Sequence, residues 1–498
     1  MAATDPLILA IDQGTSATKA VLIDQAGQVV QRAAAELRVH HPRRGWVEQS
    51  PAEIWLSIEK SVRSCLEGTD HRRLAGIGLS TQRESLLLWD RRTGETLSPL
   101  VSWQDQRTAP ACREYSGEAE AIRQLSGLPL DPMFSATRAR WLLDHVDPDR
   151  TRTSRGDLCL GTVDAWLLRQ LTGQDQIEVG NASRTQLMDI LTCRWSSPLL
   201  DLFGVPEQAL PQIVSSAGPF ARRRDDSAVP AGVPVLAVMG DSHAALFGHA
   251  GWRPGLVKAT YGTGSSVMAV SAAPRSQAVG LCETVAWQIG DQPVRAVEGN
   301  IRSSGATLAW LAQLTSVSPG QLASLAADAA ADGVHLVPGF SGLGAPWWDP
   351  EAAGLLTGLT LGTRLENVAR AALESIAFQV NDLATAIDQA SGPASILSAD
   401  GGAAASSTLM QLQADISGIP VQRPETANLS ALGAAHLAGL AAGLWSTEDL
   451  DALSRPRDEF TPATEPRWRQ GEVAAWRAAV RRARYRPDEP DHNPREEP

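Results

Sequence analysis

The stretch VLAVMGDSHAALFG, from Val235 to Gly248, decides the fold of this chain. Its apolar run has the length of a strand and ends at Gly240. Asp241 follows at once, and the small and apolar residues after it predict the start of a buried helix. In α/β proteins, ligands bind at such strand-to-helix turns, at the carboxyl ends of the strands. Asp241 is therefore a candidate catalytic base or metal ligand, and the alternative is a helix cap.

The chain has 498 residues, which is too many for one ordinary hydrophobic core. We expect two domains, residues 1–250 and 251–485, and a disordered tail over residues 486–498. The net charge is −12 and the arginines are dispersed, which argues against binding to nucleic acid or to an anionic membrane. Small molecules are the expected partners.

The five cysteines are widely spaced and include no CxxC pair, which favours a reduced, cytoplasmic compartment. No basic region precedes the apolar run at the N-terminus, so we expect no signal peptide. Residues 426–444 carry no charge, but their polar, alanine and glycine residues make them only weakly apolar. A buried helix is expected there, and no membrane insertion.

A polar tip, DQGTSATK at residues 12–19, lies between two predicted strands. It has the groups that bind phosphate: hydroxyls from Thr15 and Ser16, a positive charge from Lys19, and a carboxylate, Asp12, that can hold Mg²⁺. Many hairpin tips without a ligand have a similar composition. The tip does not match the GxxxxGK[ST] pattern of P-loops, and no GxGxxG follows a strand in the chain.

The predicted strand LAGIGLS delivers Thr81-Gln82-Arg83-Glu84 at its end. Arg83 and Glu84 can bind the hydroxyls of a polyol, one donating and one accepting, or form an exposed ion pair of little energetic consequence. Trp103 can present a flat apolar face to a carbon chain, or pack in the core. Helices are expected from Pro51 to about Leu66, over residues 137–145, and over residues 161–173, which end at a glycine.

The second half contains a similar tip, residues 262–266, within VKATYGTGSSVMAV. Two such tips, one in each half, could grip a polyphosphate from both sides and indicate a duplicated core. A third glycine cluster, residues 400–403, follows the apolar run ASILSA and precedes a helix expected to begin near Ser406. This strand, glycine turn and helix arrangement suits a nucleotide.

Together these residues resemble the FGGY family of carbohydrate kinases, and most closely its glycerol kinase branch. The resemblance runs from Ile8 to about Arg477. The motifs that carry it, in the order of the family, are DQGTSATK, GWVEQSPAEIW, TQRES, GTVDAWLL, NASRTQL, the GD at residues 240–241, TYGTG, GFSGLGAPWWDPEAAG, DGGA and ALGAAHLAGLA.

The resemblance implies an α/β protein with two actin-like (ribonuclease H-like) domains around a catalytic cleft. ATP would bind mainly on the C-terminal domain and the polyol or sugar mainly on the N-terminal domain. Asp241 would be the catalytic base. The other implied residues are, for the substrate, Arg83, Glu84, Trp103, Met133, Asp241 and Ser242; for ATP, Thr15, Ser16, Lys19, Thr263, Gly264, Gly305, Gly402, Ala403 and Ser407; and for Mg²⁺, Asp12 and Asp241.

Two departures from the glycerol kinase branch concern the substrate. Ser242 stands where that branch has a longer glutamine, and Met133 stands where it has a tyrosine, so two polar contacts to glycerol are missing. Losing such contacts changes substrate discrimination strongly, and the pocket could suit a larger polyol or a ketose. His243, beside the base, either adds a new contact or is a packed histidine.

Other departures concern nucleotide binding and regulation. Lys19 replaces an arginine of the branch, and Ser406-Ser407 stand where an asparagine pair often lies near the adenine. The loop RRRDDSAVPAG, residues 222–232, lacks the glycine and arginine pattern that binds fructose 1,6-bisphosphate in bacterial glycerol kinases. We therefore expect no inhibition by that sugar phosphate.

The leading interpretation is an ATP-dependent kinase for a small polyol or sugar, with glycerol as the default acceptor. The alternative within the class is a four- or five-carbon polyol or ketulose of the erythritol, xylulose or ribulose type. A non-catalytic actin-like sensor of nucleotide and sugar is the alternative from another class. A homodimer and a homotetramer both stay open.

Overall fold

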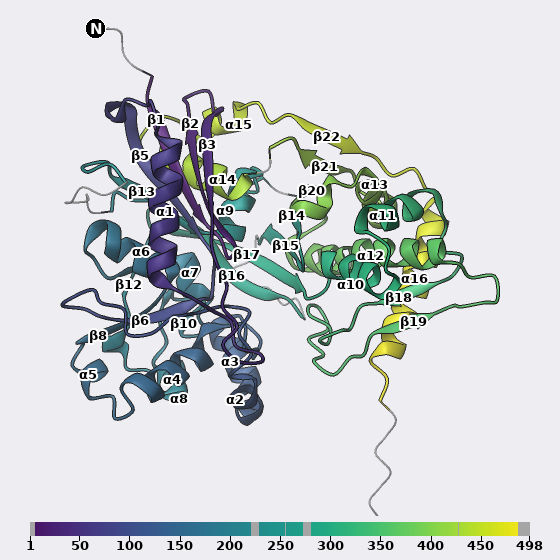
Figure 1. Cartoon of the computed structure of the whole chain (residues 1–498), viewed down its shortest axis with the longest axis horizontal. Coiled ribbons are helices and arrows are strands. Elements are labelled where there is room, and N and C mark those ends of the chain that lie inside the picture. The colour runs from purple at the N-terminus through teal and green to yellow at the C-terminus, as the bar shows by residue number, and fades with distance from the viewer. Residues whose placement is uncertain (1–4, 221–228, 254, 272–279, 427, 487–498) are drawn as a thin grey trace, which may run out of the picture.

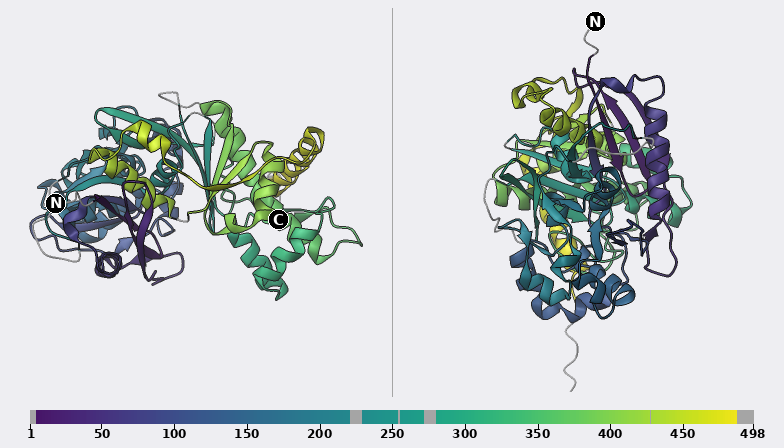
Figure 2. Two further views of the ribbon diagram at one scale, coloured as in Figure 1. Left: turned by 90° about the horizontal axis from the view of Figure 1, so that it is seen from above. Right: turned by 90° about the vertical axis from the view of Figure 1, so that its left-hand side faces the viewer.

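The computed structural model describes residues 5–220, 229–253, 255–271, 280–426 and 428–486. These residues form two halves that lie side by side, each with a central sheet and helices packed against it (Figure 1). Figure 2 shows the two halves joined at the middle of the molecule, with the purple N-terminal strands in one half and most of the green helices in the other. The molecule is thus an α/β protein with two domains.

The first sheet has the strand order β13-β5-β1-β2-β3. β1, β2 and β3 are antiparallel neighbours, whereas β5 and β13 run parallel to β1. Both faces of β1 are covered, with Leu7, Leu9 and Ile11 in one hydrophobic cluster and Ile8 and Ala10 in another, so its sequence is continuously apolar. The strands are β1 (Leu7–Gln13), β2 (Ala17–Ile23), β3 (Val29–Glu36), β5 (Leu74–Thr81) and β13 (Val235–Gly240).

The second sheet repeats the first. Its seven strands are β14 (Leu256–Tyr261), β15 (Ser265–Val270), β16 (Cys282–Ile289), β17 (Gln292–Ile301), β20 (Ile396–Asp400), β21 (Val421–Pro424) and β22 (Arg457–Phe460). Five of them, in the order β21-β20-β14-β15-β17, match β13-β5-β1-β2-β3 in sequence of neighbours and in parallel or antiparallel sense. The duplicated core that the two polar tips indicated is confirmed.

Two helices at equivalent places join the halves. α9 (Asp241–Gly248) follows β13, and α14 (Leu429–Ala441) follows β21. The backbones touch, since a Cβ on Gly433 would lie 1.7 Å from the carbonyl oxygen of Ala244. α14 also packs against β1, β5 and β13, so this late segment of the chain covers one face of the first sheet.

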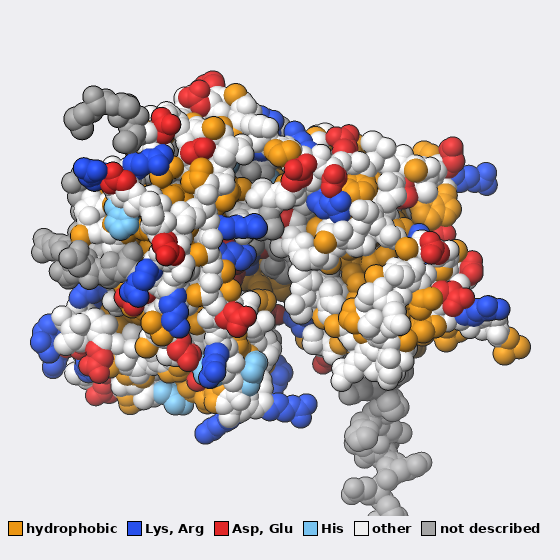
Figure 3. All heavy atoms as spheres, turned by 45° about the horizontal axis from the view of Figure 1, so that its top comes forward, with side chains coloured by type: hydrophobic (Ala, Val, Ile, Leu, Met, Phe, Trp, Pro, Cys, Tyr) orange, Lys and Arg blue, Asp and Glu red, His pale blue; other side chains and the backbone are white. Residues whose placement is uncertain are grey.

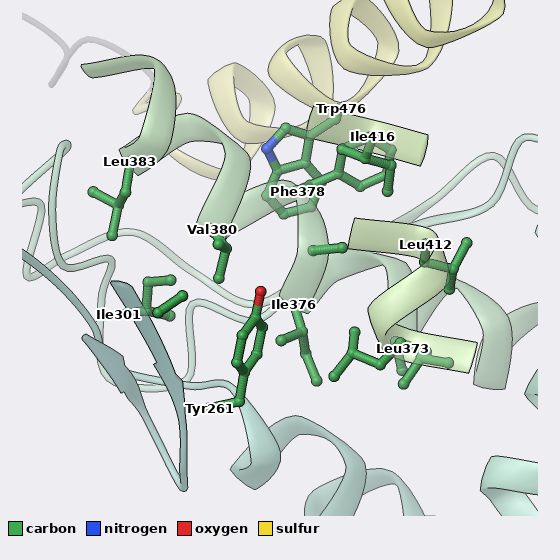
Figure 4. Close-up of a cluster of buried hydrophobic side chains, with 14 of the residues drawn as sticks. Tyr261, Ile301, Leu373, Ile376, Phe378, Val380, Leu383, Leu412, Ile416 and Trp476 are labelled. Atoms are coloured by element: carbon green, nitrogen blue, oxygen red, sulfur yellow. The ribbon is translucent and has the colours of Figure 1, made fainter. Parts of the chain in front are cut away.

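The core of the second half lies between its sheet and three helices, α12 (Leu365–Ser391), α13 (Ser407–Ser417) and α16 (Pro466–Ala483). Figure 4 shows this cluster, with Phe378 of α12 beside Trp476 of α16 and Tyr261 of β14 below them. The rings of Phe378 and Trp476 stack at 5.3 Å. Each polar atom has a partner: the Trp476 indole donates to Asp382, and the Tyr261 hydroxyl donates to Gln413.

The remaining elements surround the two sheets. A four-stranded sheet has the order β4-β7-β6-β8, with β4 (Glu48–Gln49), β6 (Leu86–Asp90), β7 (Leu100–Val101) and β8 (Leu158–Thr162). The short pairs are β9 (Gln176–Glu178) with β12 (Gln212–Val214), β10 (Met188–Asp189) with β11 (Arg194–Trp195), and β18 (His335–Val337) with β19 (Leu355–Thr357). The other α-helices are α1 (Pro51–Cys65), α2 (Ala109–Glu114), α3 (Ala119–Ser126), α4 (Ser135–Val146), α5 (Thr151–Ser154), α6 (Val163–Thr172), α7 (Val179–Ser183), α8 (Ser197–Phe203), α10 (Gly305–Thr315), α11 (Pro319–Asp328) and α15 (Thr447–Ala452).

Most predicted elements are confirmed, including α1, α4, the start of α13, and the buried helix within residues 426–444, which is α14. The helix predicted over residues 161–173 is wrong at its start, because Gly161 pairs with Leu87 as part of β8 and the helix begins at Val163. The expected tail, apart from Arg486, and most of the loop at residues 222–232 lie outside the described residues. Among the helices that the structure describes, none combines the length and apolarity needed to span a bilayer.

Candidate active site

Asp241 is the first residue of α9, directly after β13. It is not the helix cap, since that position is held by Gly240, and its Oδ1 accepts a 2.6 Å hydrogen bond from the backbone N–H of Ser242. The side chain is 38% exposed. Removal of water by the surrounding protein raises the pKa of Asp241 to about 6; Arg83 opposes this rise, and Asp12 and Glu84 add to it. A carboxylate with these properties can accept a proton near neutral pH.

Asp12 and Asp241 both lie at the carboxyl-terminal ends of strands of the first sheet. β5 separates their strands, with Ser80 beside Asp12 and Thr81 beside Gly240 in the register. The Ser80 hydroxyl donates to Asp12 Oδ1 at 2.8 Å, and Lys19 Nζ lies 3.9 Å from Oδ2. Burial raises the pKa of Asp12, which Lys19 opposes.

Thr15 and Trp103, predicted to serve the phosphate and the substrate respectively, contact each other. The Trp103 indole donates a 3.0 Å hydrogen bond to the Thr15 hydroxyl, and Gln49 donates to the Thr15 carbonyl at 2.7 Å. Trp103 is half-buried and Ser16 is exposed. Trp103 therefore lies beside the polar tip and is not packed in the core.

Arg83 and Glu84 do not form an exposed ion pair, because both are buried and each has another partner. The two terminal nitrogens of Arg83 donate to Glu298 at 2.8 and 2.7 Å, and its Nε lies 3.4 Å from Asp241 Oδ1. Glu84 accepts a 2.6 Å hydrogen bond from Arg184. The backbone of Glu84 has a φ of 60°, a left-handed conformation that costs a non-glycine residue energy and is often found at functional sites.

Met133 and His243 have different surroundings, the first apolar and the second polar and charged. Met133 is half-buried and packs against a small cluster of Leu128, Phe134 and Cys282. His243 is fully buried, and its Nε2 lies 3.2 Å from the Thr284 hydroxyl and 3.4 Å from Arg83. Burial and the neighbouring Arg83 hold the pKa of His243 well below its usual value, as expected for a packed, neutral histidine.

The predicted nucleotide residues of the second half form two turns at the ends of the adjacent parallel strands β14 and β20. In the first, Thr263 is exposed, and Gly305 begins α10 with its N–H bonded to the Gly262 carbonyl at 2.9 Å. In the second, Gly401 adopts a φ of 91°, and a Cβ there would lie 2.5 Å from the carbonyl oxygen of Tyr261. The set comprises Thr263, Gly264, Gly305, Gly402, Ala403 and Ser407, the last of which bonds Arg423.

These turns have the chemistry of an anion site. α10 and α13 both begin beside them, and the N-terminus of a helix carries the positive end of its dipole. The first two N–H groups of α10 are bonded to the carbonyls of Gly262 and Thr263. His249, which caps the end of α9, links the second turn to the helix of Asp241: its Nε2 lies 2.9 Å from Asp400 Oδ2, and its Nδ1 lies 2.7 Å from the Ser398 hydroxyl. The molecular surface between the two halves is hollowed (Figure 3).

The structure adds three residues that the sequence reasoning missed: Arg184, Glu298 and His249. Arg184 lies in the motif NASRTQL, to which the sequence assigned no role, and Glu298 is an acid within the buried stretch of β17 from Ala296 to Gly299. A charged residue that interrupts a buried strand was the available signal for Glu298. His249 carried no such signal.

Comparison with known proteins gives a consistent result. The profile of the N-terminal domain of the FGGY family of carbohydrate kinases matches residues 7–248, and the profile of its C-terminal domain matches residues 257–442. A glycerol kinase from Aromatoleum aromaticum is 44% identical, covering 96% of this chain and 98% of its own. An apulose kinase from Pectobacterium atrosepticum is 42% identical, covering 97% and 99%. The crystal structure of Plasmodium falciparum glycerol kinase with ADP superposes with a TM-score of 0.89 at 28% identity, covering 97% and 99%.

Proposed function

Because this chain belongs to the FGGY family of carbohydrate kinases, we propose that it transfers the γ-phosphoryl group of ATP to a primary hydroxyl of a small polyol or sugar, with glycerol as the default acceptor. The observation that carries the proposal is the place of Asp241. It is a partly exposed carboxylate with a raised pKa, at the end of β13, the outermost strand of the first sheet, and beside a buried arginine. We place the boundary between the two domains near residue 250.

Asp241 acts as the general base that takes the proton of the attacking hydroxyl. Arg83 carries five N–H donors; Glu298 takes two, and His243 and Asp241 each lie 3.4 Å from another, which leaves one terminal N–H to bind an acceptor hydroxyl. Glu84 accepts from a second hydroxyl, and the half-buried face of Trp103 packs against the carbon chain. These contacts hold the hydroxyl in line with the phosphate, which is a large part of what a kinase contributes to the rate.

The phosphates and the nucleoside bind to the polar tips and the glycine turns. Thr15, Ser16 and Lys19 supply hydroxyls and a charge, and the N-termini of α10 and α13 supply the positive ends of their helix dipoles. Asp12, with Asp241 nearby, would hold Mg²⁺, which neutralises phosphate charge when bound. Within the described residues, no three His, Cys, Asp or Glu side chains gather as a metal site.

A larger acceptor, a four- or five-carbon polyol or ketulose, is the second candidate. Met133 and Ser242 offer fewer polar contacts than a glycerol site needs, and Met133 faces an apolar cluster. A relative that is 42% identical is named apulose kinase, whereas other relatives of similar identity are named glycerol kinase. Relatives at this level of identity are therefore named for different acceptors. The site residues Arg83, Glu84 and Asp241 serve either acceptor.

The test is an ADP-release assay on the purified protein with glycerol, erythritol, threitol, ribitol, xylitol, xylulose, ribulose and apulose. We expect ATP-dependent turnover with glycerol, or a higher kcat/KM with one of the larger acceptors if the altered pocket sets the choice. If none of them is phosphorylated but nucleotide and sugar bind tightly, the kinase proposal fails and the alternative of a non-catalytic sensor is favoured.

A further inference from the structure

Five charged side chains form an unbroken row from Asp241 to Glu84. Asp241 meets Arg83 at 3.4 Å, Arg83 meets Glu298 at 2.7 Å, Glu298 meets Arg184 at 3.0 Å, and Arg184 meets Glu84 at 2.6 Å. Negative and positive charges alternate along the row. Its two ends are the proposed base and a proposed ligand of the acceptor, so the row connects two parts of the proposed site.

Glu298 is the centre of the row and comes from the other half of the molecule. It lies on β17 of the second sheet, whereas the other four residues precede residue 250. Ser266 of β15 donates to Glu298 Oε1 at 2.8 Å, which fixes the carboxylate from its own side. β16 and β17 reach into the first half, where Trp287 and Ala296 join the cluster of Ile8 and Ala10 (Figure 1).

Both arginines depend on this one carboxylate. The side chains of Glu298 and Arg184 are fully buried, and that of Arg83 is 7% exposed. Burial opposes the ionisation of Glu298, but Arg184 and Arg83 outweigh it and lower the pKa. Without the carboxylate, two buried guanidinium groups would face each other and would turn to the remaining acids, Asp241 and Glu84.

The distances show how Glu298 limits Arg83. The two oxygens of Glu298 accept hydrogen bonds from the two terminal nitrogens of Arg83, and this bidentate arrangement fixes a guanidinium group firmly. The Nε of Arg83 is left 3.4 Å from Asp241, which is longer than a charge-assisted hydrogen bond. Arg83 therefore stays beside the base without binding it tightly, and the carboxylate of Asp241 keeps its exposed side free for a hydroxyl proton.

We propose that Glu298 is a positioning residue for phosphoryl transfer: by holding Arg83 and Arg184 from the second half, it keeps Arg83 from closing on Asp241 and aligns Glu84. This inference rests on the proposed function. If Glu298 had only a structural role, its ion pairs would hold the two halves together, but its replacement would leave the kcat of the folded protein unchanged.

The test compares Glu298→Gln with Glu374→Gln. Glu374 is a buried acid of α12 that is bonded to Arg370 at 2.7 Å, away from the row, so it controls for the loss of a buried ion pair in the same half. We expect Glu298→Gln to lower kcat per nucleotide-binding site about 100-fold, since displacements of about 1 Å have such effects. The KM for ATP should change by less than about threefold, and Glu374→Gln should keep the wild-type kcat.

A second variant and a structure complete the test. Glu298→Asp keeps the charge but reaches less far, so it should recover part of the lost kcat. A crystal structure of either variant should show Arg83 closer to Asp241, a result that does not depend on turnover. If the wild type phosphorylates no acceptor, the proposed function fails. The position of Arg83 in the variant structures then still tests whether Glu298 keeps Arg83 away from Asp241. Wild-type kcat in Glu298→Gln, or an unmoved Arg83, would overturn the inference.

Discussion

The ionisation of Asp241 is coupled through their charges to four side chains, Arg83, Asp12, Glu84 and Lys258, of which Arg83 lies 3.4 Å away. Three of these come from the ends of neighbouring strands of the first half, and Lys258 comes from β14 of the second. Lys258 is fully buried, and burial lowers its pKa. The pKa of Asp241, the proposed base, is thus set by several elements as well as by its own turn.

We predict that the reaction slows at acidic pH. Because Asp241 must be deprotonated to accept a proton and its pKa is about 6, kcat/KM should fall as the pH drops through that value. The measurement is kcat/KM for the best acceptor from about pH 5 to about pH 8, with circular dichroism at each pH to confirm that the protein stays folded. A profile that stays flat down to about pH 5 would contradict the assignment.

Individual residues were predictable where a local pattern marked them. Asp241 directly follows β13, Asp12 is the next-to-last residue of β1, and Thr15 lies in the tip after β1. The structure does bring Thr15 and Trp103 into contact. Arg83 was recognised, but its burial and its bond to Glu298 were not. That pair joins residues 215 positions apart, and no local pattern of a single sequence encodes such a contact.

At the scale of elements, the contact between α9 and α14 matters most, because α9 carries Asp241 at its first position. The two helices meet backbone to backbone through Gly433 and Gly248. A Cβ on Gly433 would lie 1.7 Å from the carbonyl oxygen of Ala244, three residues after Asp241, and a Cβ on Gly248 would lie 2.5 Å from the Leu429 carbonyl. Neither neighbour is the flexible end of a side chain, so the helices would have to move apart.

We predict that Gly433→Ala destabilises the protein by about 2 kcal/mol, as overpacking does, and lowers activity by shifting α9. The matched control is Gly471→Ala in α16, where a Cβ meets nothing within 4 Å. That change should stabilise the protein by about 0.5–1 kcal/mol through helix propensity. Thermal and urea unfolding of the two variants measure the difference, and equal midpoints would show that the helices are not in close contact.

The elements themselves were largely predictable from apolar periodicity, caps and glycines. α1 begins after Ser50, whose side chain accepts from the Glu53 N–H, as the sequence SPAE predicts. The start of α6 was mistaken because a buried helix and the buried strand before it are both apolar. What periodicity does not reveal is that α14, late in the chain, packs on the first sheet.

At the scale of the whole molecule, the duplicated sheets explain why the site has matching parts. Both sheets end a first strand in a three-residue tip, residues 14–16 and 262–264, and both place a polar turn after the adjacent parallel strand. The duplication was foreseeable from the two tips. The links between the halves, Glu298 with Arg83 and His249 with Asp400, were not, because they depend on how the halves pack.

In the mechanism we propose, this chain is a kinase in which Asp241 is the base. The most direct test is Asp241→Asn, assayed for transfer from ATP to the best acceptor and for ATP affinity by calorimetry. We predict a loss of kcat of about 1,000-fold, within the range for general bases, and a Kd for ATP within about threefold of the wild type. Transfer by Asp241→Asn at more than about a tenth of the wild-type rate would contradict the account.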